Sequence, residues 1–201
     1  MIRVLLAEDQ GMMRGAIAQL LGLERDIEVV AQVASGAEVV EAVRAARPHV
    51  AVLDIEMPGR TGIEAAEELR RERLDCRVLI VTTFSGPGYC RRALDAGALG
   101  FMAKDKPVEE LADAIRRVNA GEQVVDPLMA AAALAAGPSP LTAREREVLA
   151  AAADGAPVMS LAKRLHLSES TVRNYLSSAT QKIGVRNRME AVNKARQNGW
   201  L

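Results

Sequence analysis

Cysteine and histidine are scarce in this chain: among 201 residues only Cys76, Cys90, His49 and His166 occur. The cysteines belong to no CxxC pair or Cys/His cluster, and the histidines have no partner at metal-ligand spacing. The sequence therefore gives no support to a disulfide framework or a structural zinc site. We expect ordinary cytosolic thiols, and histidines that lie at the surface or cap a helix.

Long apolar runs are missing as well. No run approaches the roughly 20 apolar residues that a bilayer span requires, and no early stretch has the basic start and apolar centre of a secretion signal. We expect a cytoplasmic protein without membrane insertion. Because 49% of the 201 residues are hydrophobic, the chain can bury a sizeable core, and two modest domains are the better expectation.

A net charge of zero conceals an uneven distribution. Residues 1–120 carry 16 Lys/Arg and 19 Asp/Glu, whereas residues 138–201 carry 10 and 5, which makes the last segment +5. A basic segment of this kind often binds nucleic acid, although a solvated surface excess of this size is also common.

Hydrophobic periodicity divides the chain at the same place. Five short apolar runs alternate with helical patterns, and runs without polar alternation are typical of strands covered on both faces. We predict a five-stranded parallel doubly wound sheet over residues 1–120. Residues 121–137 are alanine-rich and are interpreted as a linker, in part helical. Residues 138–201 contain four helical patterns and no strand signal, which predicts an all-α second domain. The expected strands are 2–7, 27–34, 50–54, 77–83 and 98–103; the expected helices are 11–23, 36–46, 61–73, 87–97 and 107–120.

Polar side chains follow four of the predicted strands. Glu8 and Asp9 follow the first, Asp54 the third, Thr82 the fourth and Lys104 the fifth. Since ligands of parallel sheets bind at the carboxyl ends of strands, these groups are expected to converge. Taken singly, each is more often a turn former or a solvated charge, and Thr83 competes with Thr82 for the hydroxyl role.

Three carboxylates, a hydroxyl and an ammonium favour a divalent cation beside a phosphoryl group. Asp9 and Asp54 are expected to bind Mg²⁺ directly, while Glu8 holds a metal-bound water and the backbone carbonyl of Glu56 supplies another oxygen. Lys104 and the Thr82 hydroxyl are expected to contact phosphoryl oxygens. The expected product is an acyl phosphate on Asp54.

The strings AED, VLDIEMPGRTG, TTF and GFMAKDKPVEEL give residues 2 to about 119 a close resemblance to the receiver domain of two-component response regulators. The resemblance implies that Asp54 accepts a phosphoryl group from a sensor histidine kinase with Mg²⁺ bound. It also implies that Thr82 moves toward the phosphate and that Phe101 then turns inward; otherwise Phe101 is an ordinary core residue. The family often has two aspartates where this chain has Glu8 and Asp9.

The last segment reads as a helix-turn-helix. Thr142 and Glu145 predict a capping box, and Ser168 predicts the N-cap of a helix over 169–183. Val172, Leu176 and Ile183 would form its buried face. The expected DNA-contact residues include Arg173 and Asn174 for bases, with hydroxyls and a lysine for phosphates. The full set of expected contacts is Ser170, Thr171, Arg173, Asn174, Ser177 and Lys182, with Gln181 on the same exposed surface.

LTAREREVL, LSESTVRNY and VRNRMEAV resemble the LuxR-type helix-turn-helix across almost all of residues 138–201. Two departures are the segment GAPVMSLAKRL and Tyr175, where the family mostly has histidine. A receiver joined to such a domain resembles the NarL/FixJ response regulators. Three strings, DIEMPGRTGIEAAEEL, TTFSGPGY and NGW, look most like the DesR subgroup, whose members respond to membrane state and act on lipid-desaturation genes.

The resemblance implies a non-enzymatic transcriptional regulator that pairs on phosphorylation and binds double-stranded promoter DNA as a homodimer, with RNA polymerase as a further candidate partner. The pairing surface is expected on the first and fifth helices or on the fourth helix and fifth strand. The last helix, Glu190 to Gln197, is a second candidate contact. Two alternatives remain: a DNA binder independent of phosphorylation, and a phosphohydrolase that uses Asp54 as nucleophile and Glu56 as acid. The candidate pairing residues on the first and fifth helices are Met12, Met13, Ile17, Leu111, Ala114, Ile115 and Val118.

Overall fold

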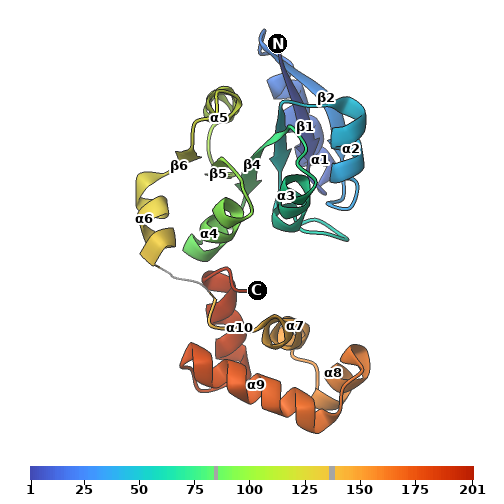
Figure 1. Ribbon diagram of the computed structural model, residues 1–201, viewed down its shortest axis with the longest axis vertical. Coiled ribbons are helices and arrows are strands. Elements are labelled where there is room, and N and C mark those ends of the chain that lie inside the picture. Colours follow the sequence, from blue (N-terminus) through green and yellow to red (C-terminus); the bar gives the residue numbers. More distant parts are fainter. Residues whose placement is uncertain (84–85, 136–138) are drawn as a thin grey trace. The chain divides into compact units, whose positions relative to one another are not determined.

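The computed structural model of the chain describes residues 1–83, 86–135 and 139–201. The chain divides into two compact units, the first built around a parallel sheet and the second entirely helical (Figure 1). An α/β unit with a parallel sheet and a separate all-α unit are the fold classes that periodicity predicts. The domain boundaries at 120 and 138 stay predictions.

Five apolar runs form the predicted strands, and each is followed by a helix. All pair in parallel in the order β2-β1-β3-β4-β5, as expected of a doubly wound sheet. The strands are β1 (Ile2–Ala7), β2 (Ile27–Val33), β3 (Val50–Leu53), β4 (Arg77–Thr82) and β5 (Gly100–Ala103). The helices are α1 (Gly11–Leu21), α2 (Val39–Ala46), α3 (Gly62–Arg71), α4 (Pro87–Asp95) and α5 (Val108–Asn119).

The sheet contains six strands, one more than the sequence predicts. A sixth strand, β6 (Val124–Val125), pairs in parallel with β5 through Gly100↔Val124 and Phe101↔Val125. It lies within the stretch interpreted as linker, and helix α6 (Pro127–Ala135) follows it. The physical reason is that an edge strand leaves backbone N–H and C=O groups unpaired, so even two valines gain hydrogen bonds by adding to it. The Val124 amide donates to the Leu99 carbonyl at 2.8 Å.

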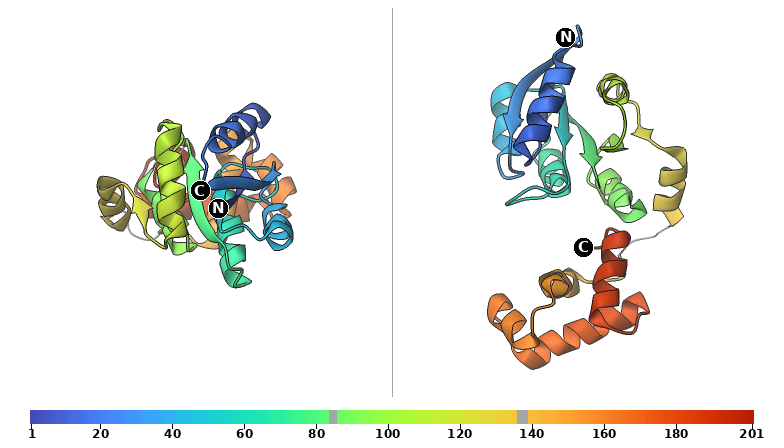
Figure 2. Two further views of the ribbon diagram at one scale, coloured as in Figure 1. Left: turned by 90° about the horizontal axis from the view of Figure 1, so that it is seen from above. Right: turned by 180° about the vertical axis from the view of Figure 1, so that it is seen from behind.

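The core of the first unit lies on both faces of the sheet. On one face, Val4, Val52 and Leu79 pack against Leu21 of α1 and Ile115 of α5. Helices α2 and α3 cover the other face; they face the viewer in Figure 1, and α1 does so in the reverse view of Figure 2. This two-sided burial is why the strands contain almost no polar residues.

The second unit contains the four predicted helices around one core. The helices are α7 (Ala143–Ala151), α8 (Val158–Leu165), α9 (Glu169–Ile183) and α10 (Arg188–Gln197), with a 3-10 turn (Ala152–Asp154) after α7. Val172, Leu176 and Ile183 are buried as expected, and Trp200 packs against the same cluster. None of the helices among the described residues is long and apolar enough to cross a bilayer.

Both cysteines are free thiols. Burial raises the pKa of the Cys76 thiol to about 12 and that of the Cys90 thiol to about 11. Because the thiolate is the reactive form, both side chains are poor nucleophiles at neutral pH.

The two histidines lie where the sequence predicts, one at a helix cap and one at the surface. His166 is the C-cap of α8, in the left-handed conformation with φ of 53°. His49 is exposed, and its Nδ1 accepts a hydrogen bond from the Arg3 amide at 3.1 Å.

Candidate functional site

The carboxyl edge of the sheet brings the predicted site residues together. The Asp54 amide donates to the Ala7 carbonyl at 2.9 Å, and the Lys104 amide donates to the Thr82 carbonyl at 2.9 Å. These backbone bonds continue the β1–β3 and β4–β5 ladders by one residue. The residue that follows each strand is therefore held at the same edge as its neighbour.

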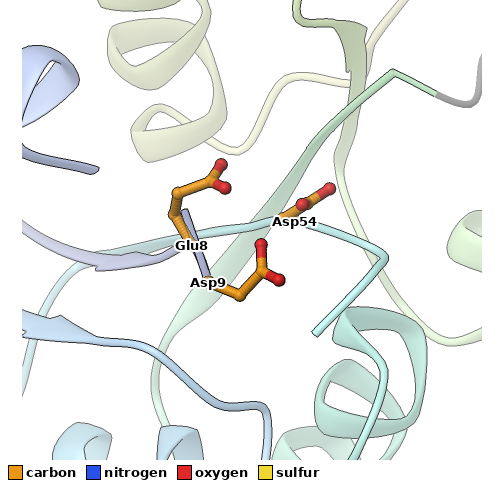
Figure 3. A group of neighbouring side chains, drawn as sticks. All are labelled: Glu8, Asp9 and Asp54. Carbon is orange, nitrogen blue, oxygen red and sulfur yellow. The ribbon is translucent and has the colours of Figure 1, made fainter. Parts of the chain in front are cut away.

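The three acidic side chains form one cluster. Oxygens of Glu8, Asp9 and Asp54 all lie within 4.8 Å of one another, around a common space (Figure 3). Asp9 is exposed, whereas Asp54 is 5% exposed and Glu8 only 1%. Three carboxylates so close repel one another unless a cation lies among them.

Lys104 supplies one such cation. Its Nζ lies 2.8 Å from Asp54 Oδ2 and 2.5 Å from Glu8 Oε2, and all three side chains are almost fully buried. Burial acts to lower the pKa of the Lys104 ammonium, but hydrogen bonds to Asp54 and Glu8 outweigh it and the pKa is raised. Lys104 is therefore a permanent positive charge beside Asp54.

Glu8 is held at both of its side-chain oxygens. Oε2 meets Lys104, and Oε1 accepts a hydrogen bond from the Gln10 amide at 3.1 Å. The Arg14 guanidinium, from α1, donates to the Glu8 backbone carbonyl at 2.5 Å. The sequence interpretation did not include Arg14; its only signal is a basic residue on the first turns of the helix that follows the acidic pair.

The acidic cluster suits a hard divalent cation. Among the described residues, Asp9 has no protein partner and Asp54 uses one of its two oxygens for Lys104. Free carboxylate oxygens are the ligands that Mg²⁺ prefers. The donor set is therefore compatible with Mg²⁺, with Asp9 and Asp54 better placed as direct ligands than Glu8.

The loop after Asp54 is shaped by close backbone contacts. A Cβ on Gly62 would lie 2.0 Å from the Asp54 carbonyl oxygen, and a Cβ on Gly36 would lie 1.9 Å from the Arg60 carbonyl oxygen. Thr61 caps α3 with a complete capping box. The glycines thus allow the loop that carries Glu56 to fold back against Asp54; the Glu56 side chain is exposed.

The expected switch residues lie on β4 and β5. Thr82, the last residue of β4, is fully buried, whereas Thr83, which lies beyond the strand, is exposed. Phe101 is 5% exposed and belongs to the core in this structure. A further hypothesis from the sequence is that Glu56 and Phe84 crowd the attacking water and so slow self-dephosphorylation; Phe84 lies outside the described residues.

In the second unit, α9 is the helix that the sequence predicts to contact DNA. The Thr142 and Glu145 capping box is present in α7, and the Ser168 side chain accepts from the Thr171 amide at the start of α9. Opposite the buried face of α9 lie exposed polar side chains. Those that the sequence predicts and the structure exposes are Ser170, Arg173, Asn174, Ser177 and Gln181, while Thr171 is half-buried.

Lys182 has a partner inside the protein. Its Nζ lies 2.8 Å from Oε2 of the buried Glu145, whose Oε1 accepts from Ser178 Oγ at 2.7 Å. Burial acts to raise the pKa of Glu145, but the hydrogen bonds from Lys182, Ser178 and Thr142 lower it to about 2. Lys182 therefore links α9 to α7. Its side chain is 38% exposed, and only this exposed part could reach a phosphate.

The candidate pairing residues separate into core and surface. Leu111, Ala114, Ile115 and Val118 of α5 are buried in the core. On α1, Met12 is 91% exposed, Met13 39% and Leu20 42%, and Leu23, just beyond the end of the helix, is 78% exposed. An apolar surface is thus available on α1 rather than on α5.

Two family models match the chain in sequence order: the response regulator receiver domain over residues 4–116 and the bacterial regulatory proteins of the luxR family over residues 139–195. The transcriptional regulatory protein DesR of Bacillus subtilis (strain 168) is 45% identical over 201 residues, which cover the whole of both chains.

Solved structures show the same architecture. Response regulator ChrA of a heme-sensing two-component system is 33% identical, with a TM-score of 0.58, over 100% of this chain and 98% of that one. RcsB from Salmonella enterica serovar Typhimurium, bound to a promoter with the phosphomimetic BeF3−, is 25% identical, with a TM-score of 0.71, over 96% and 97%. The chain belongs to the two-component response regulators of the NarL/FixJ family, in which a receiver domain precedes a LuxR-type DNA-binding domain.

Proposed function

We propose that Asp54 accepts a phosphoryl group from a sensor histidine kinase and that this modification controls DNA binding by the second domain. The observation that carries the proposal is the buried Lys104 ammonium, 2.8 Å from one oxygen of Asp54. The other Asp54 oxygen has no protein partner among the described residues. A carboxylate in this position is oriented and charge-compensated, as a nucleophile toward phosphorus must be.

The reaction is a displacement at phosphorus. The unpaired Asp54 oxygen forms the new O–P bond while the bond from phosphorus to the donor's imidazole nitrogen breaks, and the imidazole keeps the electron pair and takes up a proton. Lys104 stays beside the transferred group and balances its charge. Mg²⁺ held by Asp9, Asp54 and the Glu56 carbonyl would neutralise phosphoryl oxygens, and Glu8 would hold one of its waters.

Labelled acetyl phosphate tests the acceptor. We expect Asp54→Ala to abolish phosphoryl uptake, and Asp113→Ala, which removes an exposed carboxylate of α5, to leave uptake unchanged. Chelation of Mg²⁺ should stop uptake by the unaltered protein. Label that still reaches Asp54→Ala would move the acceptor elsewhere.

Phosphorylation would act through Thr82 and Phe101. The phosphoryl group adds about −1.5 to −2 charges at Asp54, and it shifts a two-state balance only through contacts that differ between the states. Thr82 and Lys104 are the groups that can make such contacts. Phe101, next in register to Ile80 of β4, would change its packing when Thr82 moves.

Pairing of receivers is proposed to use the outer face of α1. β6 already occupies the edge of β5, which weakens the case for the alternative surface on α4 and β5. Two receivers held together raise the effective concentration of one DNA-binding domain beside the other, so that weak half-site contacts become strong joint binding. The proposed partner is thus a second copy, bound to an inverted repeat.

On DNA, α9 is proposed to enter the major groove. Arg173 suits a guanine edge and Asn174 an adenine edge, while Ser170, Thr171 and Ser177 suit phosphate oxygens. Lys182 is proposed as a weaker phosphate contact, because its ammonium is already paired with Glu145. Arg173→Ala should weaken binding to a promoter fragment, and an unchanged footprint would remove it from this role. The likeness to DesR makes promoters of lipid-desaturation and membrane-stress genes the first to test.

Two competing functions have direct tests. Equal DNA affinity with and without acetyl phosphate would favour a regulator independent of phosphorylation. Turnover of a chromogenic phosphate ester, lost in Asp54→Ala and Glu56→Gln, would favour a phosphohydrolase. The named relatives are transcriptional regulators, which argues against the phosphohydrolase.

A further inference from the structure

Arg173 does not project freely from the recognition helix. Its Nη2 lies 2.6 Å from Oε2 of Glu169, four residues earlier on the same helix. From this pair we infer that Glu169 is a specificity-determining residue that acts through Arg173. Its carboxylate makes a contact between Arg173 and a DNA phosphate less favourable than a contact between Arg173 and a base edge. The inference rests on the proposed DNA contact of Arg173.

The pair is formed but easily opened. Glu169 precedes Arg173 by four residues, which is the favourable orientation for an ion pair along a helix. The two side chains are 43% and 63% exposed, so water competes with the pair and its net strength is small. The carboxylate therefore orients the guanidinium in the free protein without locking it away from DNA.

Phosphates and base edges respond differently to this carboxylate. The phosphate backbone binds any nearby cation, and this attraction carries no sequence information. A phosphate that approaches Arg173 also meets the negative charge of Glu169 and is repelled. A guanine edge carries no net charge, and the guanidinium has five N–H donors, enough to keep one bond to Glu169 and give two to a guanine.

The position of the pair on α9 supports this role. In helix-turn-helix proteins the N-terminal residues of the recognition helix reach the base edges. Glu169 is the first residue of α9, and Arg173 lies one turn later. Beside them, the Ser168 hydroxyl lies 2.9 Å from that of Ser170 and 2.7 Å from that of Thr171, and these three side chains carry no charge. Glu169 is thus the acidic group at the contact end of the helix.

Glu169 also has a purely structural use, because a carboxylate at a helix N-terminus interacts favourably with the helix dipole. Two substitutions separate the two roles. Glu169→Asp keeps the charge at the helix start but shortens the side chain, so that the pair with Arg173 is weakened. Glu169→Gln removes the charge and the pair together.

The experiment compares two DNA duplexes of equal length with the full-length protein, phosphorylated by acetyl phosphate. One duplex is selected from a random pool for tight binding, and the other is a scramble of it. We expect Glu169→Gln to bind the scramble several-fold more tightly and the selected duplex little differently, so the ratio of the two affinities falls. Glu169→Asp, which keeps the charge but moves it away from Arg173, should lower the ratio by a smaller factor. For Glu169→Gln the salt dependence on the scramble should steepen by about one unit of slope, as for one added phosphate contact.

Glu147→Gln is the matched control. Glu147 forms the same kind of intrahelical ion pair, with Arg144 at 2.5 Å, on α7 instead of α9. The substitution removes an equal charge, and we expect the affinity ratio to stay as in the unaltered protein. A thermal melt of each variant reports any loss of folding separately from specificity.

Four results would overturn the inference. An equal fall of the ratio in Glu147→Gln would assign the effect to net charge, and an unaltered ratio in Glu169→Asp would assign it to the helix dipole. An unaltered ratio in Glu169→Gln, with Arg173→Ala still weakening binding, would refute the inference alone. Unchanged binding by Arg173→Ala would instead refute the proposed contact and the inference with it.

Discussion

At the residue scale, the phosphoryl site depends on single positions that tolerate only one type of residue. Gly62 illustrates this dependence, because its missing Cβ leaves room for the Asp54 carbonyl. The string PGRTG predicts a loop there, but the steric reason needs the folded chain. Asp54, Asp9, Lys104 and Glu8 could be predicted from sequence because they follow apolar strands. Arg14 could not be predicted, because its hydrogen bond is to the backbone carbonyl of Glu8, and every residue type has such a carbonyl.

Gly62→Ala should destabilise the receiver by about 1–3 kcal/mol, the usual cost of forcing extra atoms into a packed site. A Cβ only 2.0 Å from the Asp54 carbonyl oxygen must push that peptide away. Urea unfolding measures the change, and phosphoryl uptake should slow with it. Gly15→Ala, in α1 with nothing within 4 Å, is the control and should stabilise by about 0.5–1 kcal/mol. Equal stability of the two variants would contradict the steric account.

At the element scale, buried polar contacts join helices that the sequence shows only as separate patterns. Glu145 was predicted as half of a capping box, and that prediction is confirmed. Its second role, binding Lys182 and Ser178 of α9, involves partners 37 and 33 residues away and has no local signal. β6 could not be predicted for a similar reason. Two valines are too few to show a periodicity, and they form a strand only because the edge of β5 offers backbone groups to pair with.

The DNA-binding unit should lose stability in acid through Glu145. Its pKa is about 2 in the folded protein against an ordinary 4.5. The stabilisation is therefore complete above pH 4.5 and is lost as the pH falls from 4.5 toward 2. The shift corresponds to roughly 3 kcal/mol, and because Lys182 is partly exposed we expect about 1–2 kcal/mol.

Glu145→Gln should remove this part of the pH dependence and lower stability at pH 7 by a similar amount. Trp200 is the single tryptophan and packs on the core of this unit, so its fluorescence reports the unfolding of that unit. Glu147→Gln, at the exposed pair with Arg144, should leave the profile unchanged. A Glu145→Gln profile parallel to that of the unaltered protein would assign the acid sensitivity elsewhere.

At the scale of the whole molecule, the division into two units could be predicted because charge and periodicity change at the same place. The pairing surface could not, because apolar residues on α1 and α5 look alike in sequence. The structure separates them: the α5 residues are core, whereas Met12 and Leu20 of α1 are exposed, as is Leu23 just beyond the helix. An exposed apolar face of this kind is typical of a protein–protein contact.

Leu20→Glu should keep the phosphorylated protein monomeric, because it puts a charge into the proposed contact on α1. Light scattering after treatment with acetyl phosphate and Mg²⁺ measures the mass, and promoter affinity should fall with it. Leu128→Glu is the control: it makes the same change at an exposed leucine of α6. Dimers of Leu20→Glu at the same concentrations as the unaltered protein would exclude the α1 face.

Cys90 is buried and Cys76 is half-buried, and the raised pKa of each thiol keeps it protonated, so the native cysteines should react slowly with maleimide reagents at neutral pH. A cysteine introduced at an exposed position, such as Ser177→Cys on α9, can then be coupled to a fluorophore without first deleting the native pair. Paired with a second introduced label on the receiver, it would let energy transfer follow the spacing between the two domains as phosphate arrives.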